Sequence, residues 1–261
     1  MSEAVSTAAG GRLPSAMWLW RSSPAEAVDV VRFVAERRVR TVFLGVGWDG
    51  PEPHVVALAG RLRTAGVEVH CLGGGLDWLE RPDRASQWLA RALNAWEFDA
   101  VHLDVEVWNA AGWEDERVRL RLLEQYLTLL RTVRGAGLPL EVDVAARLAG
   151  DMAGTKRVLD AVLDPADRVT VMAYRDHAEG TDGILDFSSP ARVACVRNAV
   201  DFRIGVETQP AEKAGGPRQT FAEEGRLALD REAAVVSNHL TGNPRYLGIA
   251  VHDWHHWRKL A

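Results

Sequence analysis

The segment FDAVHLDVEVW, residues 98–108, carries a polar side chain at every second position of an otherwise apolar run. The polar positions are His102, Asp104 and Glu106. Side chains two apart on a β-strand point to the same side, so these three should form one row and the valines and leucine between them another. Burying an unpaired carboxylate costs several kcal/mol, so the polar row is not expected by accident. We therefore predict a strand whose apolar row packs against helices and whose polar row faces a barrel interior, with Glu106 nearest the mouth.

Strand-like runs alternate with amphipathic, helix-like stretches along the whole chain. The strands are expected at residues 16–20, 41–46, 67–72, 100–106, 140–145, 168–174, 203–207 and 246–252. The helices are expected at residues 24–37, 53–65, 84–96, 114–136, 155–163, 190–200 and 221–238. Pro24 and Pro190 follow pairs of serines and are interpreted as helix starts.

This alternation predicts an α/β protein with a single (β/α)8 TIM barrel over residues 16–261, preceded by a disordered tail of residues 1–15. An open doubly wound sheet is the alternative, and it is disfavoured because no glycine-rich phosphate loop follows the first strand. A glycine-rich stretch, LGGGLDW at residues 72–78, does follow the third strand. We interpret its glycines as allowing the backbone to turn at the barrel mouth.

The composition restricts the partners of the chain. Its 261 residues are 26% charged with a formal net charge of −5, so no basic surface for nucleic acid or an anionic membrane is expected. No window is apolar enough to span a bilayer, and the first fifteen residues lack the features of a secretory signal, which favours a cytoplasmic protein. Cys71 and Cys195 fit no metal or redox spacing. We expect no cofactor, and the sequence leaves the oligomeric state open.

In such a barrel, functional groups lie at the carboxyl ends of the strands and in the loops that follow. This rule selects as candidate catalytic residues Asp104, Glu106, Tyr174 and Glu207. It selects as candidate substrate-binding residues Trp20, Trp48, Trp78, Trp108, Asp143, Arg175, His252 and Trp254. Indole faces suit sugar rings and cations, so we expect a small-molecule or oligosaccharide substrate.

Two strand ends resemble those of the family 18 glycoside hydrolases, the chitinase-like barrels. The fourth strand of that family carries Asp-x-x-Asp-x-Asp-x-Glu, and the residues at these four positions are Asp99, His102, Asp104 and Glu106. Histidine thus replaces the second aspartate. The sixth strand of the family ends in Met-x-Tyr, which Met172-Ala173-Tyr174 matches. The resemblance implies a retaining mechanism in which Glu106 protonates the leaving oxygen and the acetamido group of the substrate is the nucleophile, oriented by Asp104 and hydrogen-bonded by Tyr174.

The chain also departs from the family pattern. Arg175 follows the tyrosine where the family usually has aspartate, and His252 stands where the family tends to place a tryptophan, with Trp254 close by. Several loops are short, which argues against a long substrate groove, and an extracellular polymer is not expected for a chain without a secretory signal. These departures bear on the predicted substrate more than on the predicted barrel fold.

Several roles have alternatives at this level. Glu207 is either a nucleophile or base, or a structural group at the rim. Asp143 either belongs to the site or pairs with Arg147 or Arg175, and Arg175 either binds an anionic substituent or pairs with Asp176 or Asp143.

Two further alternatives concern histidines. His102 and Asp104 either satisfy each other below the active face or help to tune the acid pair. A metal site at the eighth strand matches no known spacing and is disfavoured; its ligands would come from the strand-end acids and from His252, Asp253, His255 and His256.

The favoured function is a glycoside hydrolase-like enzyme. One alternative is a lyase, cyclase or isomerase on the same barrel, with indoles stabilising a cationic intermediate. Another is a non-catalytic sugar-binding barrel, which is least favoured because the chain retains Glu106.

Overall fold

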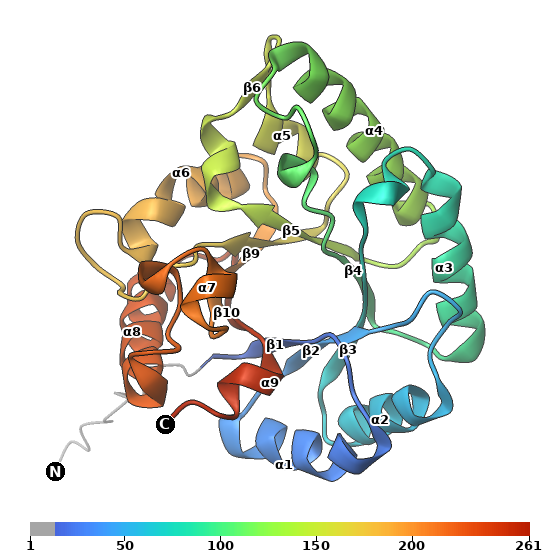
Figure 1. Cartoon of the computed structure of the whole chain (residues 1–261), viewed down its shortest axis with the longest axis vertical. Coiled ribbons are helices and arrows are strands. Elements are labelled where there is room, and N and C mark those ends of the chain that lie inside the picture. Colours follow the sequence, from blue (N-terminus) through green and yellow to red (C-terminus); the bar gives the residue numbers. More distant parts are fainter. Residues whose placement is uncertain (1–13) are drawn as a thin grey trace, which may run out of the picture.

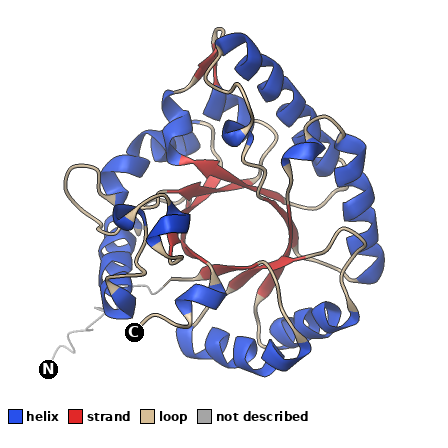
Figure 2. Ribbon diagram, in the orientation of Figure 1, coloured by secondary structure: helices blue, strands red, loops and turns tan. Residues whose placement is uncertain are grey.

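The computed structural model describes residues 14–261, whose strands close into a parallel barrel inside an outer ring of helices (Figures 1 and 2). The barrel strands are β1 (Ala16–Leu19), β2 (Thr41–Gly45), β3 (Glu68–Gly73), β4 (Ala100–Leu103), β5 (Leu140–Ala145), β8 (Arg168–Met172), β9 (Asp201–Glu207) and β10 (Tyr246–His252). Each pairs in parallel with its neighbours, and β10 pairs with β1 to complete the ring. The predicted (β/α)8 barrel is confirmed, and all the expected strands are present.

The helices follow the strands as the alternation predicts. They are α1 (Ala27–Arg37), α2 (Pro53–Thr64), α3 (Pro82–Ala95), α4 (Glu116–Arg134), α5 (Val158–Leu163), α6 (Ile184–Arg197), α7 (Ala211–Ala214), α8 (Gly225–Leu240) and α9 (Trp254–Trp257). The region expected as one helix at residues 155–163 begins instead within a small hairpin of β6 (Met152–Ala153) and β7 (Lys156–Arg157).

The predicted helix start at Pro190 is wrong. Helix α6 begins at Ile184, and Pro190 lies inside it. The first backbone N–H groups of α6 have partners outside the helix. Ile184 N donates to His177 O, and Leu185 N donates to Ala178 O. These bonds allow the helix to begin before the proline, where no local sequence signal marks a start.

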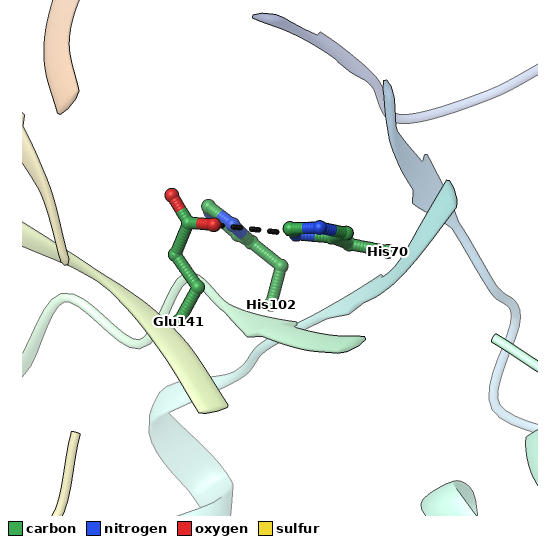
Figure 3. Close-up of side chains that lie close together, drawn as sticks. All are labelled: His70, His102 and Glu141. Carbon is green, nitrogen blue, oxygen red and sulfur yellow. Dashed lines mark ion pairs between the residues drawn. The ribbon is translucent and has the colours of Figure 1, made fainter. Parts of the chain in front are cut away.

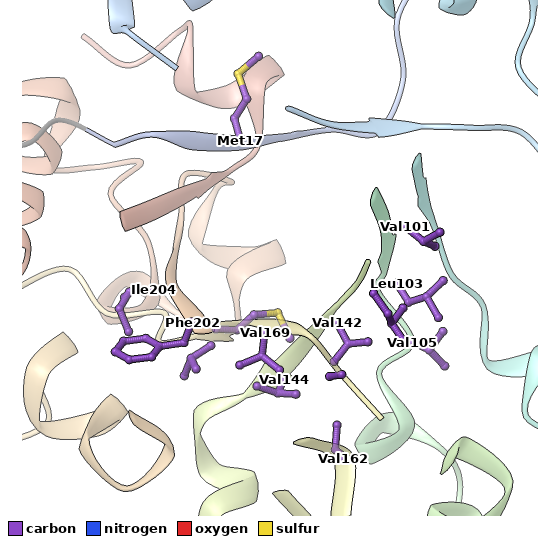
Figure 4. Packing of buried hydrophobic residues seen from close by; sticks show 14 of the residues in the cluster. Met17, Val101, Leu103, Val105, Val142, Val144, Val162, Val169, Phe202 and Ile204 are labelled. Carbon is purple, nitrogen blue, oxygen red and sulfur yellow. The ribbon is translucent and has the colours of Figure 1, made fainter. Parts of the chain in front are cut away.

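The valine and leucine row of β4 packs outward, as predicted from strand parity. Val101, Leu103 and Val105 belong to the core between strands and helices, together with Val142 and Val144 of β5 (Figure 4). The barrel interior holds a separate apolar cluster of Ala16, Trp18, Phe43, Leu72 and Ala250. The two sides of the sheet therefore carry different cores.

The rest of the barrel interior is polar. The buried polar side chains on the inward face of neighbouring strands include His70, His102, Glu141, Asp143, Thr170 and Arg203. Barrel interiors are ordinarily filled by branched apolar residues, and burying charged groups is costly unless they are paired. These groups pair with one another, as in the contacts of Glu141 with Thr170 and Arg203.

Strand β4 is shorter than predicted. It ends at Leu103 rather than at Glu106, although Asp104 N still donates to Gly73 O at 3.0 Å. The chain then turns into a short 3-10 helix over Val107–Asn109. Glu106 therefore stands on a loop at the mouth of the barrel, immediately before this turn.

The glycines at the end of β3 allow close packing. A Cβ on Gly73 would lie 2.4 Å from Cζ2 of Trp88, and one on Gly74 would lie 1.9 Å from the carbonyl oxygen of Asp104. Neither glycine has a positive φ. These two residues let β3 and its loop approach Asp104 and α3.

The beginning of the described chain is part of the barrel. Ser15 is buried, and its backbone N–H donates to Ile249 O at 2.9 Å. The predicted disordered tail of residues 1–15 is therefore too long at its carboxyl end. Its residues 1–13 lie outside the described residues. Within the described part of the chain, no helix is long and apolar enough to cross a membrane.

Candidate active site at the carboxyl end of the barrel

The predicted catalytic residues come together at the carboxyl ends of the strands. Asp104 and Glu106 follow β4, Tyr174 follows β8, and Glu207 is the last residue of β9. Burial raises the pKa of the Tyr174 hydroxyl, and the charges of Glu207, Asp143, Asp104 and Glu106 raise it further. The charges of four carboxylates thus act on the Tyr174 hydroxyl, as expected for groups that lie close together.

Glu106 is partly buried and has a perturbed carboxyl group. Burial raises its pKa above the ordinary value, and the charge of Asp143 adds to this increase. Asn109, one turn later in the short helix, donates its side-chain N–H to Glu106 Oε2. This contact fixes the orientation of the carboxyl group but does not prevent its pKa from rising.

Asp104 lies deeper than Glu106. Burial raises its pKa well above the ordinary value, and the charges of Asp143 and Glu106 raise it further. Its Oδ1 atom is buried and has no hydrogen-bond partner among residues 14–261. An unpartnered buried polar atom is costly, which is typical of a group kept for function.

Asp143 connects two other interior side chains. Its Oδ2 accepts a hydrogen bond from Trp18 Nε1 at 3.0 Å and lies 3.0 Å from His102 Nε2. The alternative in which Asp143 pairs with Arg147 or Arg175 is therefore wrong, because neither arginine contacts it.

The contacts of His102 also differ from the alternative in which it pairs with Asp104. Its ion-pair partner is Asp143 rather than Asp104, and its ring stacks on Phe43 with 3.7 Å between centroids. His102 is completely buried. Its partner Asp143 carries the charge that raises the pKa of both Asp104 and Glu106.

Glu207 and His252 form a hydrogen-bonded dyad. Glu207 Oε1 accepts hydrogen bonds from the backbone N–H groups of Thr208 and Gln209, at 2.7 and 2.8 Å. His252 Nδ1 lies 3.0 Å from Glu207 Oε2, and His252 Nε2 accepts the indole N–H of Trp20 at 3.1 Å. Burial would lower the pKa of His252, but the hydrogen bond and charge of Glu207 raise it to about 9.

A pocket of about 590 Å³ opens beside this cluster, above the ends of β1, β2 and β3. Three of the predicted substrate-binding residues, Trp20, Trp48 and Trp78, line it. Trp48 is the most exposed of these, at 38%, and the guanidinium of Arg91 lies 4.8 Å from its ring centroid. The volume is typical of small-ligand sites.

Three other predicted substrate-binding residues lie elsewhere. Trp254 is completely buried in α9, with Arg258 4.2 Å from its ring centroid, so it offers no face to a ligand. Trp108 is buried in the outer core. Arg175 pairs with Asp182 at 2.8 Å rather than with Asp176 or Asp143.

Some residues of the site were not predicted. Trp18 lies on the inward face of β1, two residues before Trp20, so strand parity alone was sufficient to find it. Tyr126 belongs to α4, is fully buried, and has a hydroxyl without a hydrogen-bond partner in the described chain. Burial raises the pKa of Tyr126, and the charges of Asp143 and Asp104 raise it further. No signal in the helix sequence distinguishes it from an ordinary core residue.

The histidines of the disfavoured metal set do not converge. His256 Nδ1 binds Asp253 at 2.8 Å, whereas His255 Nε2 lies 3.0 Å from the carbonyl of Arg21. Among residues 14–261, the metal-type donors that do converge are those of His70, His102 and Glu141, deeper in the barrel.

Comparisons with known proteins support the barrel. No family model matches the sequence, and no curated protein is similar to it in sequence. Among solved structures, the spore cortex-lytic enzyme SleL of Bacillus cereus has a TM-score of 0.60 at 13% identity, covering 94% of this chain and 73% of that one. A GH18 chitinase from Pseudoalteromonas aurantia has a TM-score of 0.54 at 12% identity, covering 92% and 94%. A proposed deoxyribose-phosphate aldolase from Coccidioides immitis has a TM-score of 0.52 at 13% identity, covering 92% and 79%. At these identities the similarity shows the fold alone.

Proposed function

We propose that this barrel is a glycoside hydrolase-like enzyme that acts on a small glycoside or oligosaccharide, with Glu106 as the general acid. The observation that carries the proposal is the placement of Glu106, a partly buried carboxyl group at the mouth whose pKa is raised by burial and by Asp143. A carboxyl group that keeps its proton at higher pH can donate it to a glycosidic oxygen. The neighbouring pocket is lined by indoles, which suit sugar rings.

Substrate assistance is the proposed route. The acetamido oxygen of the substrate attacks the anomeric carbon while Glu106 protonates the leaving oxygen, and water then opens the cyclic intermediate with Glu106 acting as base. Asp104 and Tyr174 lie near Glu106, since the charges of Asp104 and Glu106 both raise the pKa of Tyr174, and they would orient and hydrogen-bond the acetamido group. The similarity of the fold to a chitinase and to a spore cortex-lytic enzyme is consistent with this chemistry.

The surroundings of Glu207 favour this route over a second carboxylate nucleophile. Its carboxylate already receives two backbone N–H groups and faces His252. Both carboxylate oxygens of Glu207 therefore already have partners within the protein. Glu207 is better suited to orienting His252 than to forming a covalent intermediate.

The test is the variant Glu106→Gln, assayed on aryl N-acetylglucosaminides and on N-acetylglucosamine oligomers. Loss of the general acid should reduce kcat by about 10²–10⁴-fold without loss of folding. Glu36→Gln, on the exposed face of α1, is the matched control and should retain full activity. Turnover by the Glu106 variant near the wild-type rate would remove this residue from the mechanism.

A second candidate, a lyase or isomerase, is favoured by one observation. An imidazole held by a carboxylate, as in the pair of His252 and Glu207, is a general acid–base arrangement that substrate-assisted hydrolysis does not require. Reactions run in ¹⁸O-labelled water separate the two candidates. A hydrolase incorporates the label into the reducing sugar, whereas a lyase or isomerase forms its product without incorporating oxygen from water.

A further inference from the structure

We propose that His70, His102 and Glu141 bind one divalent transition-metal ion, such as Zn²⁺, inside the barrel (Figure 3). The three residues come from the adjacent strands β3, β4 and β5, and their side chains converge in the barrel interior. One donor atom from each lies within 4.8 Å of the others, and all three residues are completely buried. Two imidazoles and a carboxylate form a ligand set that suits such ions.

The separation between two of the donor atoms fits ligands of one ion. His70 Nδ1 lies 3.3 Å from Glu141 Oε2, longer than the roughly 2.7–2.9 Å of a charge-assisted hydrogen bond. Ligands held about 2.0–2.1 Å from a tetrahedral ion stand roughly 3.4 Å apart. Both ring nitrogens of His70, both of His102, and Glu141 Oε2 lack hydrogen-bond partners in the described chain. An ion would satisfy one such atom on each residue.

The other polar atom of each ligand lies near a second polar group. Glu141 Oε1 accepts hydrogen bonds from Thr170 Oγ1 at 2.9 Å and from Arg203 Nε at 3.1 Å, which leaves Oε2 directed at His70. His102 Nε2 lies 3.0 Å from a carboxylate oxygen of Asp143. Metal-binding histidines usually have a carboxylate or carbonyl at the second nitrogen, which fixes the orientation of the ring.

The second nitrogen of His70 lies near a route of access. His70 Nε2 is 3.6 Å from Glu68 Oε2, and the side chain of Glu68 is 49% exposed. Glu68 lines a pocket of about 380 Å³ at the amino ends of the strands, together with Thr41 and Arg203. An ion could reach His70 from this end, opposite the candidate active site, so the metal site does not depend on the proposed function.

The first experiment uses the full chain after removal of metals with a chelator. Titration with Co²⁺ should give one equivalent bound and the intense visible absorption of a low-coordinate site with nitrogen and oxygen ligands. Metal analysis after equilibrium dialysis against Zn²⁺ should also give one equivalent, and Zn²⁺ should raise the melting temperature, since a ligand that binds only the folded state stabilises it. Absence of Co²⁺ absorption and of retained Zn²⁺ would overturn the proposal.

Variants then assign the ligands. Glu141→Gln and His70→Gln should each abolish the Co²⁺ absorption, and His239→Gln, an exposed histidine on α8, should leave it unchanged. Thr170→Val covers the case in which a ligand variant does not fold, because it removes only one hydrogen bond to Glu141. It should weaken Zn²⁺ binding by about 10–100-fold, the usual effect of such a supporting residue. Unchanged binding in folded Glu141→Gln or in Thr170→Val, or loss of binding in His239→Gln, would show an adventitious surface ion instead.

Discussion

Trp20 donates its indole N–H to His252 Nε2 at 3.1 Å and so joins the wall of the tryptophan-lined pocket to the cluster of titratable groups. An indole nitrogen is only a donor, so this bond requires a lone pair on Nε2 and places the imidazole proton on Nδ1. Glu207, 3.0 Å from Nδ1, has the opposite influence and favours the fully protonated ring. The charge of His252 is therefore set by competition between Trp20 and Glu207.

Substitution of either neighbour should move the pKa of His252 in a defined direction. Glu207→Gln removes the negative charge and should lower this pKa from about 9, by roughly 1–3 units. Trp20→Phe removes the donor to Nε2 and should raise it. NMR titration of the histidine Cε1–H signals measures both, with Glu36→Gln as a control. A pKa that stays unchanged in Glu207→Gln would contradict the dyad.

The raised pKa of Glu106 also affects stability. A carboxyl group with a higher pKa in the folded than in the unfolded state stabilises the fold below its unfolded pKa, and this contribution is lost as the pH rises through the folded pKa. Glu106→Gln should therefore raise the melting temperature at about pH 8, and the gain should shrink toward about pH 4. Each kcal/mol corresponds to about 2–4 °C for a chain of this size. A lower melting temperature for Glu106→Gln at the higher pH would contradict the prediction.

The pH dependence of activity provides a separate prediction. The charge of Asp143 raises the pKa of Glu106, so Asp143→Asn should lower that pKa. Because a general acid must be protonated, the alkaline limb of kcat/KM should then move to lower pH. A pH–rate profile on an aryl N-acetylglucosaminide measures the shift, and Asp83→Asn, in the first turn of α3, is the control. Movement of the limb to higher pH would exclude Glu106 as the group that controls it.

Much of the fold could be predicted from strand parity, because a β-strand has a strict two-residue period. The row of His102, Asp104 and Glu106 needed no knowledge of the rest of the chain. The start of α6 could not be predicted in this way, since it depends on bonds from Ile184 and Leu185 to a preceding loop.

The strand-end rule predicted which carboxylates lie close together at the mouth, but it could not predict their partners. Trp18 and Asp143 are 125 residues apart in sequence and meet only because the barrel closes. The three proposed metal ligands likewise come one from each of three strands, so no spacing motif marks them. The position of Trp254 depends on the packing of α9 against β1 and β10, which no local pattern indicates.

Two tryptophans predicted to bind substrate should respond differently to truncation. Trp254 is completely buried, so Trp254→Ala should cost about 3–5 kcal/mol of unfolding free energy. Trp48 is 38% exposed in the pocket wall, so Trp48→Ala should change stability little and weaken binding of an oligosaccharide. Denaturant unfolding and calorimetric titration measure the two effects. Equal destabilisation by both variants would contradict these placements.

Gly74 should be intolerant of any side chain. A Cβ there would lie 1.9 Å from the carbonyl oxygen of Asp104, which is backbone and cannot rotate away. Gly74→Ala should therefore push the end of β4 outward, at a cost of about 1–3 kcal/mol, and displace Asp104 and Glu106 from the cluster. Gly60→Ala is the matched control, because a Cβ there meets nothing within 4 Å. Denaturant unfolding and the aryl glycoside assay together test the prediction, and a Gly74→Ala protein as stable and active as Gly60→Ala would show that β3 and β4 do not need this close approach.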